Sequence, residues 1–388
     1  MLLSHVKRAL TATLLVASVF PMKLVQAQPV RAETVASGLA NPWAAAFLPD
    51  GRFLVTERSG QMRLVAANGQ VAAPLAGVPP VAAGRQGGLL DLVLDADFAR
   101  NRTLFFCFSE PGAGSDSSTN STALARARLS ADATRLEDVK VIFSQKPKVP
   151  GNLHFGCRIV EGRAGGAAAP PDGMLFLTLG DRFSRKDDAQ TLDNHHGKVI
   201  RIHKDGRVPA DNPFVGKPGA MPEIWSYGHR NLQGAVLAPD GSLWTHEHGA
   251  QGGDEINVAK AGLNYGWPVI THGENYGGGK IGDGITNKPG LEPPLHYWVP
   301  SIAPSGMAFL TSERYGKGWV GNLFVGSLKF GYLNRIELAE PFKGKVLREN
   351  KLLENERERI RDVRQGPDGL LYVLTDSATG RLIRLLPQ

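Results

Sequence analysis

The chain repeats a pattern in which a tight turn is followed by a short apolar run. The four clearest copies begin with Pro-Asp-Gly, at residues 49–51, 171–173, 239–241 and 367–369. Proline presets φ at the second position of such a turn, and glycine adopts the left-handed conformation that the turn requires. Two weaker copies lie at residues 101–106 and 321–325. The sequence therefore predicts six equivalent units, each with a β-strand directly after its turn.

Further alternating runs follow these strands and predict a neighbouring strand in several units. They include residues 63–65, 198–202, 333–336 and 381–385, and no convincing amphipathic helix accompanies them. Repeated short meanders of this kind are typical of a β-propeller. We therefore expect an all-β, six-bladed β-propeller, with a pair of β-sandwiches as the alternative. Three insertions rich in Gly, Pro and Ala, at residues 162–173, 205–222 and 273–294, are expected to be long loops crossing one face of the propeller.

The first residues have the features of an export signal. His5, Lys7 and Arg8 precede an apolar run at residues 9–20, and small residues at Val25-Gln26-Ala27 offer a cleavage site. The apolar run is too short to span a membrane, and no other segment is a candidate. We expect residues 1–27 to be a signal peptide, residues 28–388 to form a single catalytic domain, and the mature protein to be periplasmic without an integral membrane segment. An uncleaved membrane anchor is the alternative.

Charge and cysteine content narrow the possible partners. The 388-residue chain has a formal charge of +7, and loss of Lys7, Arg8 and Lys23 with the signal would leave +4. This mild excess, without a basic run interleaved with aromatics, gives no indication of nucleic-acid binding. The two cysteines, Cys107 and Cys157, lie in apolar runs. They could pair in an oxidising compartment, but two buried free thiols are the favoured interpretation.

Polar side chains on glycine turns are densest at residues 224–268, which we interpret as one face of a cofactor site. Arg230 and Asn231 follow a tight turn there, and Lys329 ends another strand. Arg359 and Arg361 are two residues apart, so on a strand they point to one side. Equivalent strand ends of a propeller converge on its axis, where four cations would repel unless a polyanionic ligand neutralised them. Solvated surface arginines are the alternative for Arg359 and Arg361 taken alone.

Two further residues could carry chemistry. His154, in Gly-Asn-Leu-His-Phe-Gly, could remove a proton near neutral pH, although a lone histidine is more often structural. Glu255, in Gly-Gly-Asp-Glu, offers a hard oxygen ligand beside glycine turns and could bind calcium, although such a turn is usually a solvated loop. No pair among His195, His196, His246 and His248 has the helical spacing of a zinc motif.

The chain resembles the soluble sugar dehydrogenases that depend on pyrroloquinoline quinone (PQQ), and within them the periplasmic aldose sugar dehydrogenases. Ten separated motifs from about Gly38 to Leu386 carry the resemblance. They are Gln86-Gly-Gly-Leu-Leu, His154-Phe-Gly, Leu179-Gly-Asp181, residues 225–234, Glu247-His-Gly249, residues 252–257, residues 264–268, Ser305-Gly-Met-Ala-Phe, Ser327-Leu328-Lys329 and Arg359-Ile360-Arg361-Asp-Val. Members of this family are six-bladed propellers, in agreement with the repeat count.

The resemblance implies roles for individual residues. Arg230, Asn231, Ser327, Leu328, Lys329, Arg359, Ile360 and Arg361 would bind the tricarboxylate quinone, with Gln86 and Tyr276 adding polar or stacking contacts. The carbonyls of Gly249 and Ala250 would hold a calcium ion that also contacts the quinone, and Glu255 and Tyr265 resemble a second calcium position. Gln86 and Asp181 are candidate substrate contacts; a turn-capping role is the alternative for Asp181.

The implied reaction is oxidation of an aldose at C1 to a lactone. His154 resembles the general base that takes the anomeric proton while hydride passes to C5 of the quinone, with calcium as Lewis acid and Arg230 stabilising the oxyanion. Electrons would then leave to a respiratory quinone or a small periplasmic acceptor, and the protein is expected to be a monomer or homodimer. Ala250 replaces a proline common in relatives, and residues 182–186 do not match the substrate loop of glucose-specific members.

Two rival functions share parts of this pattern. A calcium-dependent propeller hydrolase, such as a lactonase, would use a histidine and calcium but gives no reason for the four cations. A non-catalytic binding propeller would have lost the base or a cation, and both are present here. A requirement for the quinone separates the three.

Overall fold

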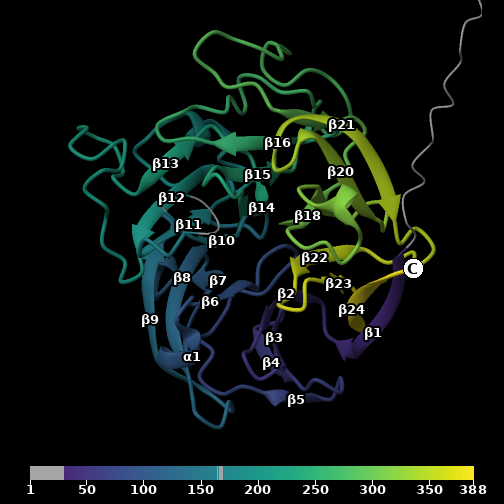
Figure 1. The fold of residues 1–388 in the computed structure, drawn as a ribbon. Coiled ribbons are helices and arrows are strands. Elements are labelled where there is room, and N and C mark those ends of the chain that lie inside the picture. Colours follow the sequence, from purple (N-terminus) through teal and green to yellow (C-terminus); the bar gives the residue numbers. More distant parts are fainter. Residues whose placement is uncertain (1–29, 164, 166–168) are drawn as a thin grey trace, which may run out of the picture.

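Six four-stranded antiparallel sheets form a ring, as predicted. The computed structural model describes residues 30–388 except 164 and 166–168, so the predicted signal peptide at residues 1–27 lies outside the described residues. Within the described residues the sheets have the orders β2-β3-β4-β5, β6-β7-β8-β9, β10-β11-β12-β13, β14-β15-β16-β17, β18-β19-β20-β21 and β22-β23-β24-β1. The sheets are arranged as blades around a central axis (Figure 1). The architecture is therefore a six-bladed β-propeller.

The strands are short, as the turn spacing predicts. The first three blades contain β2 (Pro42–Phe47), β3 (Phe53–Glu57), β4 (Gln61–Val65), β5 (Val71–Pro74), β6 (Leu89–Leu94), β7 (Thr103–Pro111), β8 (Asn120–Leu129), β9 (Leu136–Ser144), β10 (Ile159–Glu161), β11 (Met174–Thr178), β12 (Lys198–His203) and β13 (Ile224–Tyr227). The last three contain β14 (Leu232–Leu237), β15 (Leu243–Glu247), β16 (Asp254–Ala259), β17 (His296–Trp298), β18 (Pro304–Phe309), β19 (Leu323–Ser327), β20 (Leu333–Glu340), β21 (Lys343–Leu352), β22 (Ile360–Gln365), β23 (Leu371–Thr375), β24 (Gly380–Pro387) and β1 (Val30–Leu39).

Helical structure is confined to four short pieces of the described chain. These are α1 (Phe98–Asn101) and three 3₁₀ turns, η1 (Gly114–Asp116), η2 (Lys186–Gln190) and η3 (Lys317–Trp319). None of the helices in the part of the chain that the structure describes is long and apolar enough to cross a membrane. The absence of amphipathic helix patterns is thus matched by the fold.

Each of the six repeated turns precedes the second strand of a blade. The Pro-Asp-Gly turns lead into β3, β11, β15 and β23, and the two weaker copies lead into β7 and β19. The second strands are almost wholly buried and supply much of the core between blades. The turn signal therefore marks the centre of each blade, and the remaining strands are added on either side.

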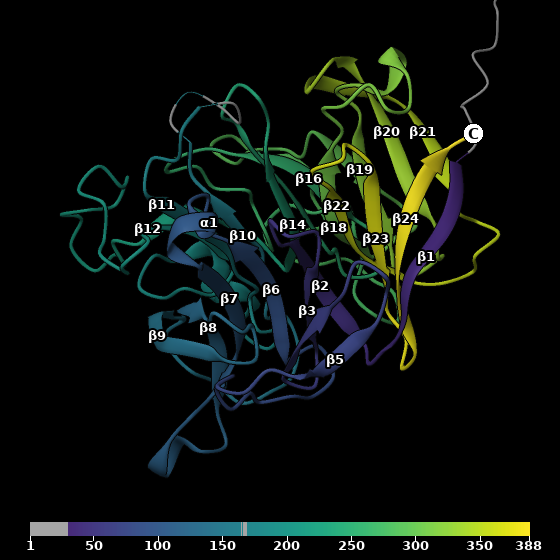
Figure 2. The same ribbon diagram turned by 60° about the horizontal axis from the view of Figure 1, so that its bottom comes forward.

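The ring closes through its two ends. β1 pairs with β24 in antiparallel register from Val30 opposite Pro387 to Leu39 opposite Gly380, so the amino-terminal strand is the outer strand of the last blade. Figure 2 shows the purple β1 lying beside the yellow β24, with the carboxyl end next to both. Closure removes two sheet edges that would otherwise be free to pair with other chains.

The three long insertions do not all extend from the same end of the ring. Residues 162–173 join the first and second strands of one blade, and residues 205–222 join its third and fourth strands; in an antiparallel sheet these connections leave the same end. Residues 273–294 lie between β16 and β17 but reach the opposite end, where Glu274 bridges Gln251 and Tyr276 contacts Arg230. The third insertion consequently belongs to the functional face described below.

Cys107 and Cys157 form a disulfide, and our interpretation of two free thiols was wrong. Their Cα atoms are 6.8 Å apart although 50 residues separate them in sequence. Cys107 lies on β7, and Cys157 lies just before β10, the innermost strand of the next blade. Neighbouring blades pack face to face, which brings together two apolar runs whose proximity sequence spacing cannot show.

Removing this disulfide should lower stability without changing the fold. A bond closing a loop of this length restricts the unfolded chain, and its loss should reduce the free energy of unfolding by about 4 kcal/mol. The measurement is chemical denaturation of the Cys107→Ala/Cys157→Ala protein against wild type, with reduced wild type as the control. Two free thiols in the unreduced, unfolded wild-type protein would contradict the pairing.

Candidate functional site

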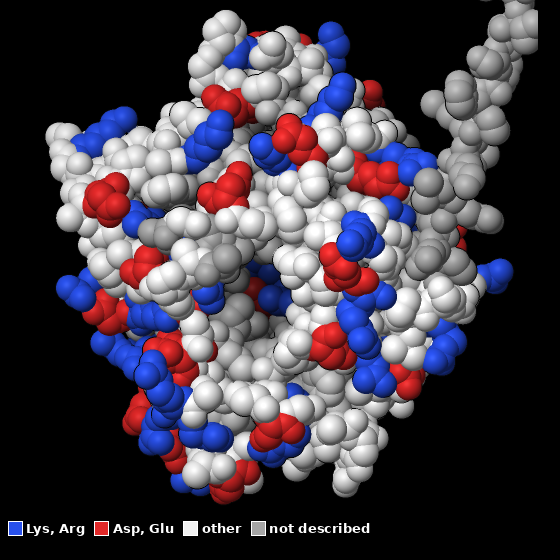
Figure 3. Space-filling view, viewed as in Figure 1, with Lys and Arg blue, Asp and Glu red and all other residues white. Residues whose placement is uncertain are grey.

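The predicted site residues gather at one end of the propeller. The segments carrying His154, Arg230 and Arg359 connect successive blades, and those carrying Asp181, Gly249 and Lys329 connect second to third strands. Because neighbouring strands are antiparallel, these two kinds of connection leave the ring at the same end. The expected convergence of equivalent strand ends on the axis is therefore present. Figure 3 shows the opposite face of the ring, where basic atoms are also visible in a hollow in which the blades meet.

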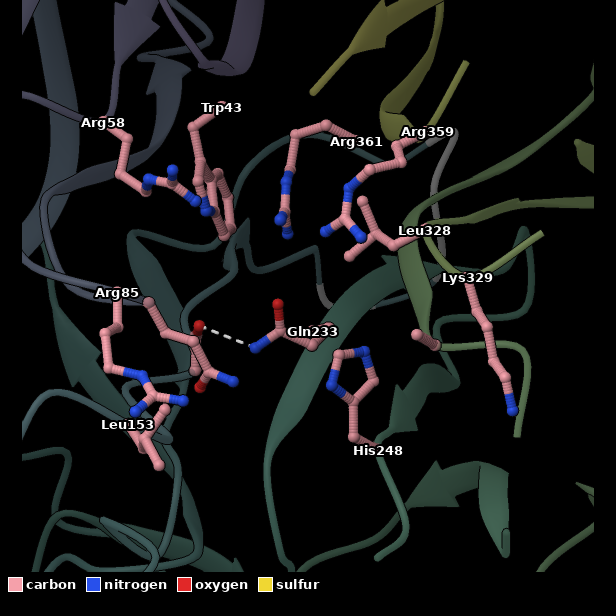
Figure 4. A pocket seen from close by; sticks show the side chains of 13 residues that line it. Trp43, Arg58, Arg85, Leu153, Gln233, His248, Leu328, Lys329, Arg359 and Arg361 are labelled. Atoms are coloured by element: carbon pink, nitrogen blue, oxygen red, sulfur yellow. Dashed lines mark hydrogen bonds between the residues drawn. The ribbon is translucent and has the colours of Figure 1, made fainter. Parts of the chain in front are cut away.

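A cavity of about 580 Å³ lies among these connections. Five of the predicted residues line it: Gln86, Leu328, Lys329, Arg359 and Arg361. The remaining lining residues are Trp43, Arg58, Arg85, Leu153, Gly156, Gln233, His248 and Ala303. Five of the thirteen lining residues carry positive charge and none carries negative charge, so the cavity suits an anionic ligand. Figure 4 shows Arg359, Arg361 and Lys329 on one side and Arg58 and Arg85 on the other.

One buried acid partly balances these cations. Asp376 Oδ2 accepts from Arg361 at 2.9 Å and from Arg359 at 3.2 Å, and Arg58 Nη1 is 4.0 Å from Asp376 Oδ1. Burial alone would raise the pKa of Asp376, but Arg361 and then Arg359 outweigh that effect and lower it to about 2. Asp376 therefore stays ionised and orients both arginines on the same side, as their spacing predicts.

A smaller cavity of about 120 Å³ adjoins the first through the loop that carries His154. Leu153 and Gly156 line the larger cavity, whereas His154 lines the smaller one. The predicted residues Asp181, Arg230, Ala250 and Tyr276 also line the smaller cavity, with Phe183, Lys186, Trp267, Asn275 and Ile281. The loop of residues 153–156 thus separates a strongly basic compartment from one that contains the candidate base.

His154 is held in one orientation by a buried carboxylate. Its Nδ1 lies 2.6 Å from Asp181 Oδ1, and both side chains are almost wholly buried. The remaining Asp181 oxygen accepts from Trp267 Nε1 at 2.8 Å, and Asp181 Oδ1 also accepts from the Phe183 amide at 2.8 Å. Both oxygens of Asp181 are therefore occupied by protein donors. This geometry assigns Asp181 to orienting His154, a role that the sequence pattern did not show, in preference to contacting substrate.

Burial keeps His154 neutral. Desolvation lowers the pKa of the His154 imidazole from its ordinary value, the Asp181 carboxylate opposes the shift, and the nearby Arg230 adds to it. Burial would raise the pKa of Asp181, yet His154 and Arg230 outweigh it and lower that pKa. An imidazole that is neutral at pH 7, with its Nδ1 bonded to Asp181, leaves Nε2 as the nitrogen that can accept a proton.

The backbone around His154 is strained and pinned in place. His154 has a φ of 52°, in the left-handed region that residues other than glycine seldom adopt, and its amide donates to Gln86 Oε1 at 2.8 Å. Arg182, with a φ of 57°, donates to Leu153 O and Gly151 O at 3.1 and 2.7 Å. Such strain persists only where surrounding contacts fix it and is concentrated at functional sites. Gln86 therefore has a structural contact here besides its place in the cavity wall.

Arg230 connects the candidate base to a corner of backbone carbonyls. Its Nη1 donates to His248 O at 2.9 Å and to Gly249 O, its Nη2 lies 3.3 Å from Tyr276 Oη, and its buried Nε has no partner within the described residues. Tyr276 is 63% exposed and leans over the cavity mouth. The His248 and Gly249 carbonyls face a positive charge here, and carbonyl oxygens are among the ligands that calcium takes.

The second predicted metal position is a buried acidic pocket. Glu255 lies opposite Glu247 in the pairing of β15 with β16, and burial, followed by repulsion from Glu247, raises the pKa of Glu255 well above its ordinary value. Asn257 Nδ2 bonds Glu255 Oε2 at 3.2 Å, while Asn257 Oδ1 is buried without a partner in the described chain. Two opposed carboxylates beside an unsatisfied amide oxygen form a donor set suited to a hard cation.

Tyr265 can contribute only its main chain to such a site. Its hydroxyl donates to Val258 O and accepts from the Lys260 amide at 2.9 Å. Across the residues described, no group of three or more His, Cys, Asp or Glu side chains is placed to hold a metal ion. Carbonyl oxygens would therefore have to complete both calcium sites.

The remaining predicted residues lie in the walls behind the cavities. Asn231, Ser327 and Ile360 are buried. Asn231 Oδ1 accepts from the Gly156 amide at 3.3 Å, and its Nδ2 has no partner in the described chain. Ser327 Oγ donates to Ile302 O at 2.8 Å, and Ile360 O accepts from Ser305 Oγ at 2.6 Å. Of the three, Asn231 alone has a free polar hydrogen to offer a ligand.

Several contributors to the site were not predicted. Trp43, Arg58 and Arg85 line the larger cavity, and Phe183 packs edge-to-face on His154 with ring centroids 5.2 Å apart. The sequence analysis considered Phe183 only as part of residues 182–186, the loop that does not match the substrate loop of glucose-specific members. The sequence offered one signal for each arginine: Arg58 directly follows a strand, and Arg85 directly precedes Gln86.

Comparison with known proteins identifies the family of this chain. The family model described as Glucose / Sorbosone dehydrogenase matches residues 39–384. The chain is 43% identical over 364 residues to the aldose sugar dehydrogenase YliI of Escherichia coli K12, covering 92% of this chain and 93% of that protein. The apo crystal structure of the soluble aldose sugar dehydrogenase of Escherichia coli superimposes with a TM-score of 0.85 at 42% identity, covering 92% and 100% of the two chains.

A ligand-bound structure is also similar. The PQQ-bound form of aldose sugar dehydrogenase from Streptomyces coelicolor has a TM-score of 0.71 at 28% identity, covering 93% of this chain and 100% of that one. The family match spans most of the chain, and the resemblance seen in its motifs is confirmed. The chain therefore belongs to the glucose/sorbosone dehydrogenase family.

Proposed function

We propose that this protein is an exported, PQQ- and calcium-dependent dehydrogenase that oxidises aldose sugars at C1 to lactones. The observation that carries the proposal is the pairing of a basic cavity with a buried His154–Asp181 pair. Five cationic side chains line that cavity, more than Asp376 can balance, so a ligand with several carboxylates fits it. Bound PQQ would supply a two-electron acceptor for the hydride that leaves C1.

The side chains would divide the work as follows. Lys329, Arg359 and Arg361 bind carboxylates, and the buried Asn231 Nδ2 offers one further hydrogen bond. His154 Nε2 accepts the anomeric proton, and Asp181 stabilises the imidazolium that forms. Arg230 provides fixed positive charge where negative charge grows during oxidation. The carbonyl corner at Gly249 and Ala250 would hold one calcium ion, and the Glu255 pocket with the Tyr265 main chain a second.

Two rival functions remain as outcomes of the same test. A calcium-dependent lactonase would act without the quinone, and a binding propeller would hold a ligand without turnover. The electron acceptor would be a respiratory quinone or a small periplasmic carrier. The protein would be a monomer or a homodimer, and either state is compatible with both acceptors.

Titration of purified protein with PQQ should give saturable binding. Lys329 is exposed and makes no ion pair in the described chain, so Lys329→Gln should weaken PQQ binding roughly ten- to a hundredfold by losing one charge-assisted contact. Fluorescence titration measures the affinity, and Lys317→Gln, an exposed lysine on η3, is the matched control. Absence of PQQ binding at micromolar concentration would refute the proposal.

The candidate base can be tested by substitution and by pH. His154→Ala should lower kcat by about 10² to 10⁴ fold, and Asp181→Asn should lower it with little change in PQQ affinity. Because burial lowers the pKa of His154 and the neutral form is the active one, kcat/KM should fall only when pH drops below 6.5, the unperturbed pKa of histidine. Steady-state rates across pH check this, with His203→Ala as control. A wild-type rate in His154→Ala would remove His154 from the mechanism.

Calcium should stabilise the protein through the Glu255 pocket as well as through the cofactor site. A cation would relieve the repulsion between the buried Glu247 and Glu255 side chains, so adding Ca²⁺ to chelator-treated protein should raise Tm. Glu255→Gln should lose most of this rise in the absence of PQQ, whereas Glu354→Gln, an exposed control, should keep it. An equal calcium-dependent rise in both variants would place the ion elsewhere.

A further inference from the structure

The larger cavity carries more positive charge than its cofactor would use. Its lining includes Arg58, Arg85, Lys329, Arg359 and Arg361, and Asp376 contacts three of them, Arg58, Arg359 and Arg361. Under the proposed function, three quinone carboxylates and Asp376 would balance four of these five charges. One cation remains, and the adjoining cavity adds Arg230 and Lys186 against one carboxylate, Asp181. An uncharged sugar would leave this excess without a counter-charge.

Arg85 and Lys329 are the two lining cations without an anionic partner in the described residues, and Lys329 is already assigned to the cofactor. Within the described residues the Arg85 guanidinium makes no hydrogen bond or salt bridge, whereas Arg359 and Arg361 both bond Asp376. Arg58 is intermediate, at 4.0 Å from the same acid. Figure 4 shows Arg58 and Arg85 on the side of the pocket opposite Arg359 and Lys329. The two arginines therefore form a second basic wall, separate from the one predicted to hold the cofactor.

The backbone presents Arg85 at some energetic cost. Arg85 has a φ of 48° at the tip of a tight turn closed by hydrogen bonds between Gly84 and Gly87. Glycine, asparagine or aspartate is the usual residue in this conformation, because a longer side chain is strained there. A strained residue that lines a cavity and whose guanidinium has no partner in the described residues points to a ligand contact.

The same turn is fixed to the candidate base. The main-chain N–H of Gln86 donates to Asn152 O at 3.1 Å, and the side-chain Oε1 of Gln86 accepts from the main-chain N–H of His154 at 2.8 Å. Arg85 and His154 thus lie on two loops joined directly by Gln86. Arg85 lines the larger cavity and His154 the smaller one beside it, so a sugar that binds across the loop of residues 153–156 would face both side chains.

We propose that the preferred substrates are anionic aldoses, namely hexuronic acids, whose C6 carboxylate is bound by Arg85 with support from Arg58. This inference rests on the proposed function and names the substrate class of that site. The reaction stays balanced as before: C1 loses a hydride to the quinone, O1 loses its proton to His154, and the C1–O1 bond becomes the carbonyl of a lactone. The carboxylate takes no part in bond changes. The product is a monolactone of an aldaric acid, which hydrolysis would open to the diacid.

The test compares galacturonate with galactose, which differ only in a carboxylate or a hydroxymethyl group at C5. Wild-type protein loaded with PQQ and calcium should show a kcat/KM about ten- to a hundredfold higher for galacturonate, the range expected for a charge-assisted contact. Arg85→Gln should remove that preference, because kcat/KM should fall about ten- to a hundredfold more for galacturonate than for galactose. Arg100→Gln, an exposed arginine on α1, is the matched control and should retain the preference. Raising the salt concentration should reduce the preference in wild type.

Binding without turnover provides an independent measurement. Methyl galacturonide and methyl galactoside lack a free anomeric hydroxyl and cannot be oxidised at C1, so calorimetric titration of loaded protein reports binding alone. The uronide should bind more tightly to wild type and should lose that advantage in Arg85→Gln.

Three results would overturn the inference. Equal kcat/KM values for galacturonate and galactose would show that the excess charge does not select substrate. A parallel loss for both sugars in Arg85→Gln, with weaker PQQ binding by fluorescence, would make Arg85 a cofactor anchor. Equal binding of both methyl glycosides would show that the protein makes no favourable contact with the C6 carboxylate. Failure of the proposed function itself looks different, because no sugar would then be oxidised and PQQ would not bind.

Discussion

The blades are held together at their centre by four charges, of which three are buried and the fourth, Arg364, is half-buried. Arg158, just before β10, lies 3.1 Å from Asp91 on β6 and 2.8 Å from Asp362 on β22, and Arg364 bonds the same two acids. Asp91 also accepts from the Ile159 amide, and Asp362 from the Ala45 amide on β2. Two positive and two negative charges cancel, so the network tolerates burial, whereas loss of one member would leave an unpaired charge costing about 3–5 kcal/mol. The innermost strands of several blades are thereby fixed relative to one another.

The cavity that we assign to the cofactor adjoins this neutral network. Trp43 connects the two, with the Arg158 guanidinium 4.3 Å from its ring centroid and that of Arg361 5.7 Å away. Arg158 is fully paired, but Arg361 shares Asp376 with Arg359 and lines an open cavity. Along the axis, the positive and negative charges balance in the network around Arg158, whereas positive charge is in excess in the cavity that Arg361 lines. That change separates arginines that hold the fold together from arginines that are available to a ligand.

The fold could be predicted from sequence because its signal is local. A Pro-Asp-Gly turn before each of four second strands is visible without any knowledge of packing, and six such units leave few architectures. The disulfide could not be predicted, because Cys107 and Cys157 meet only through the packing of adjacent blades. For the same reason Asp181 was recognised as a candidate but not as the partner of His154, a contact between residues 27 apart. The convergence of His154, Arg230 and Lys329 followed from the fold once it was assumed, and their chemistry from the family resemblance.

Local sequence rules fail where the site is built. Arg85, His154, Arg182 and Phe183 all have φ between 48° and 63°, a region that residues other than glycine seldom adopt. Each lies in or beside a cavity wall. The loop of residues 151–154 is held in place by a hydrogen bond from the His154 amide to Gln86 and by hydrogen bonds from Arg182. Strain fixed in this way gives the backbone little freedom to adapt to different sugars. Selection among substrates therefore falls to the side chains that these loops present, and of these Arg85 is charged, unpaired within the described chain, and directed into the cavity.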